Sequence, residues 1–166
     1  MTALSFQEAK RPFPKGSSVI SIGAPNTPSP PGVRTSEDSH LRVEFDDIAS
    51  DPPSKDQRKY FHPPEKEHVE KIIDFARNQK GPLVTHCRAG VSRSTAADVI
   101  GKCARGKDPE EAYRSMLSES PDAARVRPNR RMLRLADDAL GHDTNDLQKL
   151  LDRQDELKEE IARERD

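Results

Sequence analysis

The sequence predicts an α/β fold with a mainly parallel central sheet flanked by helices, and two observations predict it. Short β-prone segments at residues 17–23, 41–48 and 83–86 are each followed by a loop. From residue 64 onward, apolar residues recur at helical spacing in segments that glycine or proline separates. Ligands of such folds bind at the carboxyl ends of the strands, so we expect a functional site in the loops after these segments.

The first two strands are predicted from different patterns. Residues 17–23 form a continuous β-prone run that Gly23 ends, whereas residues 41–48 alternate apolar and polar side chains. The alternation continues through Asp47, which therefore lies at the end of the strand on its apolar side. The segment 24–39, rich in proline, serine and threonine, is expected to be a connector, with a wall of the functional site as the alternative.

The helices are predicted from apolar spacing and from residues that cap their ends. Pro64 is expected in the first turn of a helix that ends before Gly81, and Asp108 followed by Pro109 is a typical N-terminal cap. Near the C-terminus, Gln154 interrupts two short heptads, so a helix lying on the domain is favoured over a dimer seam. The expected helical segments are 64–80, 93 onward, 108–120, 128–140 and 144–166.

Length and composition predict one folded domain with two peripheral segments. The chain has 166 residues, of which 34% are charged, 32% are hydrophobic and 14 are proline. We expect a flexible N-terminal arm at 1–16, a folded domain at 17–141, and a charged C-terminal helix at 142–166 that packs on the domain or is partly frayed. The chain is expected to be a monomer.

Charge and hydropathy argue against several partners and locations. The net charge of −1 argues against general binding of nucleic acid or of membrane surfaces. No apolar run approaches the roughly 20 residues that cross a bilayer, and the N-terminus lacks an apolar signal segment. The two cysteines suit a reducing compartment better than a disulfide framework. We therefore expect a cytoplasmic location.

The segment 86–95 predicts a phosphate-binding loop that contains its own nucleophile. It follows the strand 83–86 and precedes a helix that begins near Ser92 or Arg93. Backbone N–H groups of such a turn and the helix N-terminus would point into one concavity, which favours a dianionic phosphate. The expected phosphate-binding residues are Arg88, Ala89, Gly90, Val91, Ser92 and Arg93.

Each residue type in this loop has a chemical reason to be there. Cys87 lies where N–H groups and nearby cations favour the thiolate, which is the nucleophilic form. Gly90 permits a tight turn without a Cβ, and Arg93 can hold two phosphate oxygens with a bidentate guanidinium. Ser94 can donate to the sulfur when the sulfur leaves phosphorus, and His86 can orient the end of the strand.

This loop resembles the signature of the cysteine-dependent protein phosphatases, which comprise tyrosine and dual-specificity enzymes. The fixed positions of that signature match at His86, Cys87, Gly90, Arg93 and Ser94. The wider chain, from Val19 to Leu140, is similar to small bacterial proteins described as predicted tyrosine phosphatases. The resemblance implies that 17–141 is a phosphatase domain and that the reaction needs neither metal nor cofactor.

The resemblance also implies a two-step reaction. The Cys87 thiolate attacks phosphorus, an aspartic acid protonates the departing oxygen, and water hydrolyses the phosphocysteine. The substrate would be a phosphorylated protein or another phosphomonoester, and the short chain favours a shallow, dual-specificity site. A phosphatase for a phosphoinositide is less favoured because the loop interior, 88–92, holds one basic residue. A catalytically silent phosphate-binding module is the alternative outside enzymes.

Several aspartates are candidates for the general acid. Asp47 is preferred, because dual-specificity enzymes carry their acid just after an alternating strand, and Asp46 is the second candidate. The interval from Asp47 to Cys87 is 40 residues, longer than in compact members of the family, and Asp51 and Asp56 lie within it. These two therefore stay open as alternatives.

Two further features of the sequence are a group of arginines and the second cysteine. Five arginines at positions 125, 127, 130, 131 and 134 could attract phosphorylated substrates, although a solvated helix face is the default interpretation; Arg125 and Asn129 are the residues of this segment to test first. Cys103 lies about 15 Å along the following helix from Cys87, beyond the roughly 7 Å that a disulfide spans. We expect no disulfide bridge between these two cysteines.

Rhodanese-type sulfur transferases also use a cysteine loop that ends in a basic residue, but their loop is usually one residue shorter than the loop that begins at Cys87.

Overall fold

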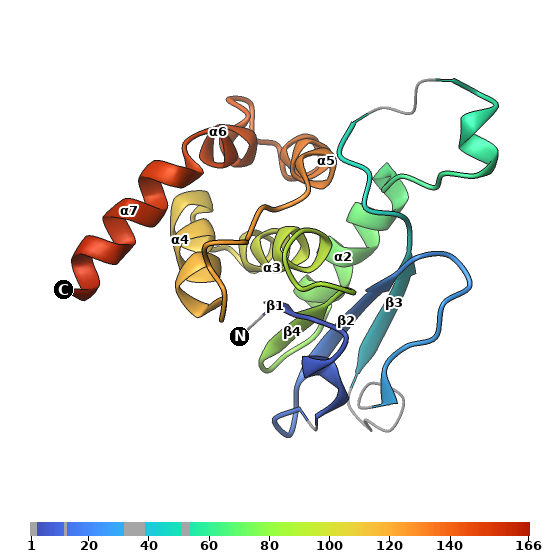
Figure 1. The fold of residues 1–166 in the computed structure, drawn as a ribbon, viewed down its shortest axis with the longest axis horizontal. Helices are drawn as coiled ribbons and strands as arrows, with labels where there is room; N and C mark the ends of the chain where they lie inside the picture. Colours follow the sequence, from blue (N-terminus) through green and yellow to red (C-terminus); the bar gives the residue numbers. More distant parts are fainter. Residues whose placement is uncertain (1–2, 12, 32–38, 51–53) are drawn as a thin grey trace.

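A four-stranded parallel sheet forms one layer of the molecule, as the sequence predicts (Figure 1). The computed structural model describes residues 3–11, 13–31, 39–50 and 54–166. The strand order is β1-β4-β2-β3, and every neighbouring pair is parallel. The strands are β1 (Ala3–Leu4), β2 (Ser18–Gly23), β3 (His40–Glu44) and β4 (Leu83–His86).

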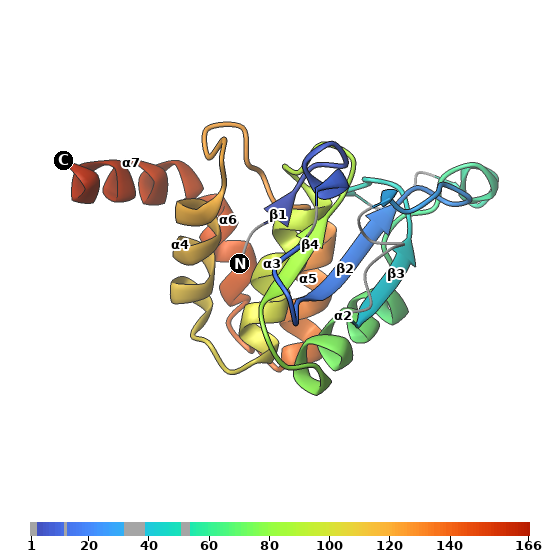
Figure 2. The ribbon, with the colours of Figure 1, turned by 90° about the horizontal axis from the view of Figure 1, so that it is seen from below.

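The helices form a second layer centred on α3 (Figure 2). α3 contacts β4 and β1 on the sheet and packs against α2, α4 and α5, so 11 of its residues are buried. The main apolar core lies between this helix layer and the sheet. The helices are α2 (Lys66–Asn78), α3 (Arg93–Ala104), α4 (Pro109–Glu119), α5 (Arg130–Leu140), α6 (Asp146–Asp152) and α7 (Gln154–Arg165). Within the parts of the chain that the structure describes, no helix combines the length and apolar character needed to cross a bilayer.

Capping side chains set several of the helix ends. Asp108 accepts hydrogen bonds from the backbone of Glu110 and Glu111 at the start of α4, as expected. α2 begins two residues later than the sequence predicts, because Glu65 and His68 form a reciprocal capping box and Pro64 precedes it. At its other end, the φ of Gly81 is +88°, which turns the chain toward β4.

The N-terminal segment differs from the flexible arm expected at 1–16. Ala3 and Leu4 pair with the residues at the end of β4 and form an edge of the sheet. Ala9 is fully buried, and Leu4 and Phe13 pack on Val19 and Val84 across the face of the sheet opposite the helices. A two-residue strand followed by polar residues carries too short a pattern to be recognised locally, because its stability comes from partners more than 70 residues away.

The C-terminal segment consists of two helices rather than one. The chain turns at Arg153, and the following Gln154 is buried, where it accepts a hydrogen bond from the Tyr113 hydroxyl and donates to the Val126 carbonyl. Leu157 and Ile161 continue the buried side of α7 along α4. Gln154 therefore anchors this segment to the domain, where the heptad pattern marked it only as an interruption.

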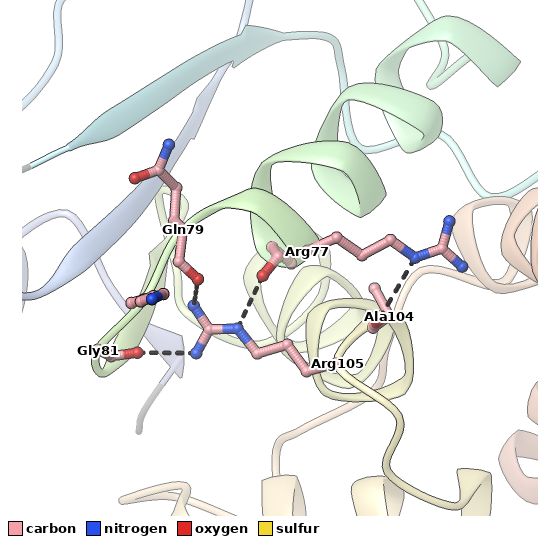
Figure 3. A pocket seen from close by; sticks show the side chains of 7 residues that line it. Arg77, Gln79, Gly81, Ala104 and Arg105 are labelled. Atoms are coloured by element: carbon pink, nitrogen blue, oxygen red, sulfur yellow. Dashed lines mark hydrogen bonds between the residues drawn. The ribbon is translucent and has the colours of Figure 1, made fainter.

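A shallow surface cavity at the amino end of β4 is occupied by a structural arginine (Figure 3). The Arg105 guanidinium donates to the carbonyl groups of Ala76, Gln79 and Gly81 at 2.8, 2.9 and 2.8 Å. These bonds satisfy backbone acceptors at the end of α2 and in the turn that follows. The cavity thus belongs to the connection between α2 and β4.

Lys102 on α3 pairs with buried Asp98 in the same helix and with Glu119 on α4. Lys102 Nζ lies 3.0 Å from Asp98 Oδ2 and 3.4 Å from Glu119 Oε2. Asp98 is fully buried, and its Oδ1 has no hydrogen-bond partner among the described residues. Burial raises the pKa of Asp98 to about 6, although the charge of Lys102 acts in the opposite direction.

Stability should depend on the ionisation of Asp98. Because the pKa of Asp98 is higher in the folded chain than its ordinary value of 3.8, its contribution to folding stability is most favourable below pH 4 and is lost as the pH rises through about 6. Asp98→Asn mimics the neutral form. As the pH rises from 4 to 7, the free energy of unfolding of this variant should increase by about 2–3 kcal/mol relative to that of the wild-type protein. Urea unfolding at several pH values measures this difference.

The matched control is Asp74→Asn, on the exposed side of α2. The difference in free energy of unfolding between this variant and the wild-type protein should stay constant over the same pH range. A constant difference for Asp98→Asn as well would show that Asp98 does not control the pH dependence.

Candidate active site

Cys87 lies at the floor of the loop that joins β4 to α3. We call residues 87–92 the Cys87 loop. The side chain of Cys87 is buried, its thiol donates to Ser94 Oγ at 3.2 Å, and the backbone N–H of Gly90 donates to its sulfur at 3.3 Å. Since α3 begins at Arg93, the helix N-terminus also faces this loop. An N–H donor, a hydroxyl group and the N-terminus of α3 therefore surround the sulfur.

The N-terminal segment holds the first part of the Cys87 loop. The backbone N–H of Cys87 donates to the Leu4 carbonyl at 3.1 Å, and that of Phe6 donates to the Arg88 carbonyl at 3.0 Å. Gly90 has a φ of +74°, and a Cβ at this position would lie 2.6 Å from the backbone nitrogen of Ser5. Glycine is therefore required here both by its backbone conformation and by the approach of the N-terminal segment.

Arg93 closes the loop from the first turn of α3. The side chain is 8% exposed, and Nη1 donates to the Phe45 carbonyl at 2.8 Å. Its Nε is buried and has no partner among the described residues, although the residue lines the cavity described below. Buried donors of this kind are normally paired, so Arg93 has hydrogen-bonding capacity available for an anion in the cavity.

His86 is held behind the Cys87 loop. Its Nε2 lies 2.6 Å from Ser21 Oγ on β2, and the same hydroxyl accepts a hydrogen bond from Arg42 Nη1 at 2.8 Å. Burial lowers the pKa of His86 to about 4, and the positive charges of Arg42 and Arg93 act in the same direction. The imidazole is therefore neutral near pH 7, and it orients the strand end without adding charge.

Asp47 is held against the Cys87 loop. Its Oδ1 accepts hydrogen bonds from Ser92 Oγ at 2.7 Å and from Asn129 Nδ2 at 2.8 Å. β3 ends at Glu44, earlier than the alternation over 41–48 predicts, so Asp47 lies in the loop that follows the strand. It is exposed and lines the same cavity as Arg93. The structure thus brings Asp47 and Arg93 together at one cavity and binds Asp47 to the Cys87 loop through Ser92.

The other candidate aspartates have different positions. Asp46 also lines the cavity, but its Oδ2 accepts the backbone N–H of His62 at 2.9 Å, which fixes the base of the loop that follows β3. Asp56 precedes a short 3-10 helix (Gln57–Lys59) and does not line the cavity. Asp51 lies outside the described residues. The geometry favours Asp47.

Asn129 has a role that the sequence did not indicate. It caps α5 by accepting from the Met132 N–H, and its backbone N–H donates to the Ser92 carbonyl. Its Nδ2 donates to Asp47 at the same time. The sequence marked Asn129 as a residue to test first, but no local pattern signals its bond to a residue 82 positions away.

The arginines of this segment are dispersed rather than gathered at the Cys87 loop. Arg131 donates to the Pro64 carbonyl and pairs with Glu65, and Arg130 pairs with Asp152. Arg125 is exposed and lies 3.8 Å from Asp122. None of these three lines the cavity at the site, so the geometry supports the solvated interpretation for them.

A cavity of about 680 Å³ opens at Arg88 and Arg93, and four segments of the chain line it. One wall comes from the N-terminal segment, and another comes from the chain after β2, including Ala24, Thr27 and Pro28. This part of 24–39 therefore lines the site as well as connecting two strands. The lining residues are Phe6, Gln7, Ile22, Gly23, Ala24, Thr27, Pro28, Arg42, Asp46, Asp47, Arg88 and Arg93.

Cys103 lies apart from this chemistry. It is a free thiol partly buried on α3 and packs against the apolar core. Burial raises its pKa to about 12, so the thiol stays protonated at neutral pH. Across the described ranges, no cluster of three or more His, Cys, Asp or Glu side chains is arranged to hold a metal ion.

Comparisons with known proteins identify the fold. No family model and no curated protein sequence matches the chain. A crystal structure of human DUSP28 carrying one substitution is 20% identical, covers 78% of this chain and 81% of its own, and has a TM-score of 0.50. A second human DUSP28 structure is 16% identical over 92% of this chain and 94% of its own (TM-score 0.49). A structure of PTPMT1 in complex with PI(5)P is 17% identical, covers 76% of this chain and 77% of its own, and has a TM-score of 0.48.

The first of these comparisons shows that the chain has the fold of the cysteine-dependent tyrosine and dual-specificity phosphatases. The resemblance seen in the sequence is thereby confirmed at the level of the fold.

The neutral state of His86 can be measured directly. NMR titration of the histidine side chains should give a midpoint of about 4 for His86, because burial disfavours the imidazolium. His40, which is exposed at the start of β3, serves as the reference in the same spectra. A midpoint for His86 near 6.5 would show that the imidazole is solvated, contrary to this structure.

Proposed function

We propose that this chain, which has the fold of the cysteine-dependent phosphatases, hydrolyses phosphomonoesters carried by proteins, as a tyrosine or dual-specificity phosphatase. One observation carries the proposal: Arg93 and Asp47 line one cavity together with Arg88, which directly follows Cys87, and Asp47 accepts a hydrogen bond from Ser92 of the Cys87 loop. A nucleophile, an anion-binding cation and a proton donor are the groups that two-step phosphoryl transfer requires.

In the first step, the phosphate group binds in the Cys87 loop. Backbone N–H groups of the loop and the guanidinium of Arg93 hold its non-bridging oxygens. The Cys87 thiolate attacks phosphorus while the bond from phosphorus to the ester oxygen breaks. Protonated Asp47 gives its proton to that oxygen, so the leaving group departs as a neutral alcohol or phenol.

In the second step, water hydrolyses the phosphocysteine. The Asp47 carboxylate accepts a proton from the attacking water, and the bond between phosphorus and sulfur breaks. Ser94 Oγ, which lies 3.2 Å from the sulfur, donates a hydrogen bond to the departing thiolate. Inorganic phosphate leaves, and Cys87 returns to its starting state. Asn129 and Ser92 keep Asp47 over the site throughout.

The size of the cavity favours a substrate larger than free phosphate. At about 680 Å³, it can receive a phosphorylated side chain together with neighbouring atoms of a peptide. The interior of the Cys87 loop adds one basic side chain, Arg88, which lines the cavity. A ligand with a single phosphate therefore suits the site better than a polyphosphorylated headgroup.

The first prediction concerns the nucleophile and the arginine. The wild-type protein should hydrolyse p-nitrophenyl phosphate, and vanadate should inhibit it because vanadate mimics the transition state. Cys87→Ser should reduce turnover to background, and Arg93→Ala should reduce kcat/KM by about 10²–10³-fold through loss of anion stabilisation. Cys103→Ser, the same substitution at a cysteine outside the cavity, should leave turnover close to wild type.

Binding of phosphorylated peptide without turnover would reject the hydrolase and favour a silent phosphate-binding module. Full activity in Cys87→Ser would exclude the phosphocysteine mechanism.

The second prediction assigns the general acid. Asp47→Asn should remove the basic limb of the pH–rate profile and lower kcat by about 10²–10⁴-fold for phenyl phosphate, whose leaving oxygen needs a proton. The loss should be smaller for p-nitrophenyl phosphate, because its leaving group departs readily as an anion. Asp56→Asn, outside the cavity, should behave like wild type.

Steady-state kinetics of both substrates from pH 5 to pH 8 distinguish the candidates. If Asp46→Asn abolished the basic limb while Asp47→Asn kept it, the acid would be Asp46.

A further inference from the structure

The N-terminal segment forms a wall of the candidate active site. Phe6 and Gln7 line the cavity together with Arg88, in the Cys87 loop, and Arg93, at the start of α3. The backbone bonds from Leu4 to Cys87 and from Phe6 to Arg88 fix this segment on the same loop that contains the nucleophile. Phe6 therefore has a defined position relative to Cys87.

A compact turn holds Phe6 from the other side. The Ser5 N–H donates to Glu8 Oε2 at 2.8 Å, and the Glu8 N–H donates to Ser5 Oγ at 3.2 Å. The N–H of Ala9 donates to the Ser5 carbonyl, and Ala9 is fully buried. Lys10 Nζ lies 5.7 Å from the centroid of the Phe6 ring. These contacts enclose the backbone of Phe6 on both sides, while its ring stays partly exposed at the cavity.

The opposite wall is also apolar and also held in place. Ile22, Ala24 and Pro28 contribute apolar surface to it. Arg42 donates to the carbonyl and hydroxyl oxygens of Thr27 at 2.7 and 3.0 Å, which fixes this part of the chain. The cavity thus has an aromatic side chain on one wall and aliphatic side chains on the other, with Arg93 and Asp47 beside them.

We infer that Phe6 is a specificity-determining residue that packs against the ring of an aryl phosphomonoester and so selects it over an alkyl one. The inference rests on the proposed function, since it concerns the group attached to the phosphate in the Cys87 loop. An aromatic ring offers Phe6 a flat apolar partner at a preferred stacking geometry. A phosphorylated serine side chain has no ring and offers Phe6 no such partner.

The test compares two peptides that differ only in carrying phosphotyrosine or phosphoserine at one position. Affinities are measured in the Cys87→Ser background, where the peptides are not consumed, and kcat/KM is measured with Cys87 present. Phe6→Ala should weaken binding of the phosphotyrosine peptide by about tenfold and leave the phosphoserine peptide unchanged. Phe6→Leu, which keeps an apolar side chain at the wall, should give an intermediate loss.

Phe13→Ala is the matched control. It removes the same side chain from the same end of the chain, but Phe13 packs on Val19 and Val84 and does not line the cavity. The ratio of the two affinities should therefore stay at the wild-type value in this variant. Circular dichroism and thermal unfolding show whether each variant keeps the fold.

The outcomes separate this inference from the proposed function. An equal loss for both peptides, or no loss for either, would overturn the role of Phe6. Selective weakening of the phosphotyrosine peptide without turnover by the wild-type protein would reject the hydrolase and keep the role of Phe6 in recognition. Turnover of both peptides with a ratio insensitive to Phe6→Ala would keep the hydrolase and reject the specificity role.

Discussion

The structure of the site depends on backbone hydrogen bonds that hold the Cys87 loop at both ends. Leu4 and Phe6 bind its first residues, while Arg127 and Asn129 bind the carbonyl groups of Val91 and Ser92. A loop whose N–H groups converge cannot satisfy its own backbone as a strand or helix does, so other segments must supply the partners. This arrangement fixes the loop before any ligand binds, and preorganised donors are what anion stabilisation requires.

The same contacts place the charges around the cavity. Asn129 caps α5, binds the Cys87 loop and holds Asp47, so one side chain couples a helix start to the candidate acid. His86 adds no positive charge near pH 7 because burial lowers its pKa to about 4. The charge that faces the cavity thus comes from arginines and aspartates, and its distribution suits a bound phosphate beside a proton donor.

Local sequence patterns were sufficient for most of the fold and for the centre of the site. The apolar run of β2, the strand before Cys87 and the helical spacing of α2, α4 and α5 each depend on neighbours within a few residues. The Cys87 loop could be recognised for the same reason, since its nucleophile, glycine and arginine lie on one short stretch of chain. Asp47 was preferred as the candidate acid because of the alternation before it, although β3 ends three residues earlier.

The sequence by itself thus determined the α/β class, the Cys87 loop and the preferred aspartate. Only the tertiary structure decided that Ala3 and Leu4 join the sheet and that Phe6 and Gln7 line the cavity. It also decided that Asn129 holds Asp47 and that Gln154 anchors α7 through Tyr113. The physical reason is the range of the interactions. Periodicity and capping act over one or two turns of chain, whereas these contacts join residues 41 to 82 positions apart, and their energies come from partners that no local window contains.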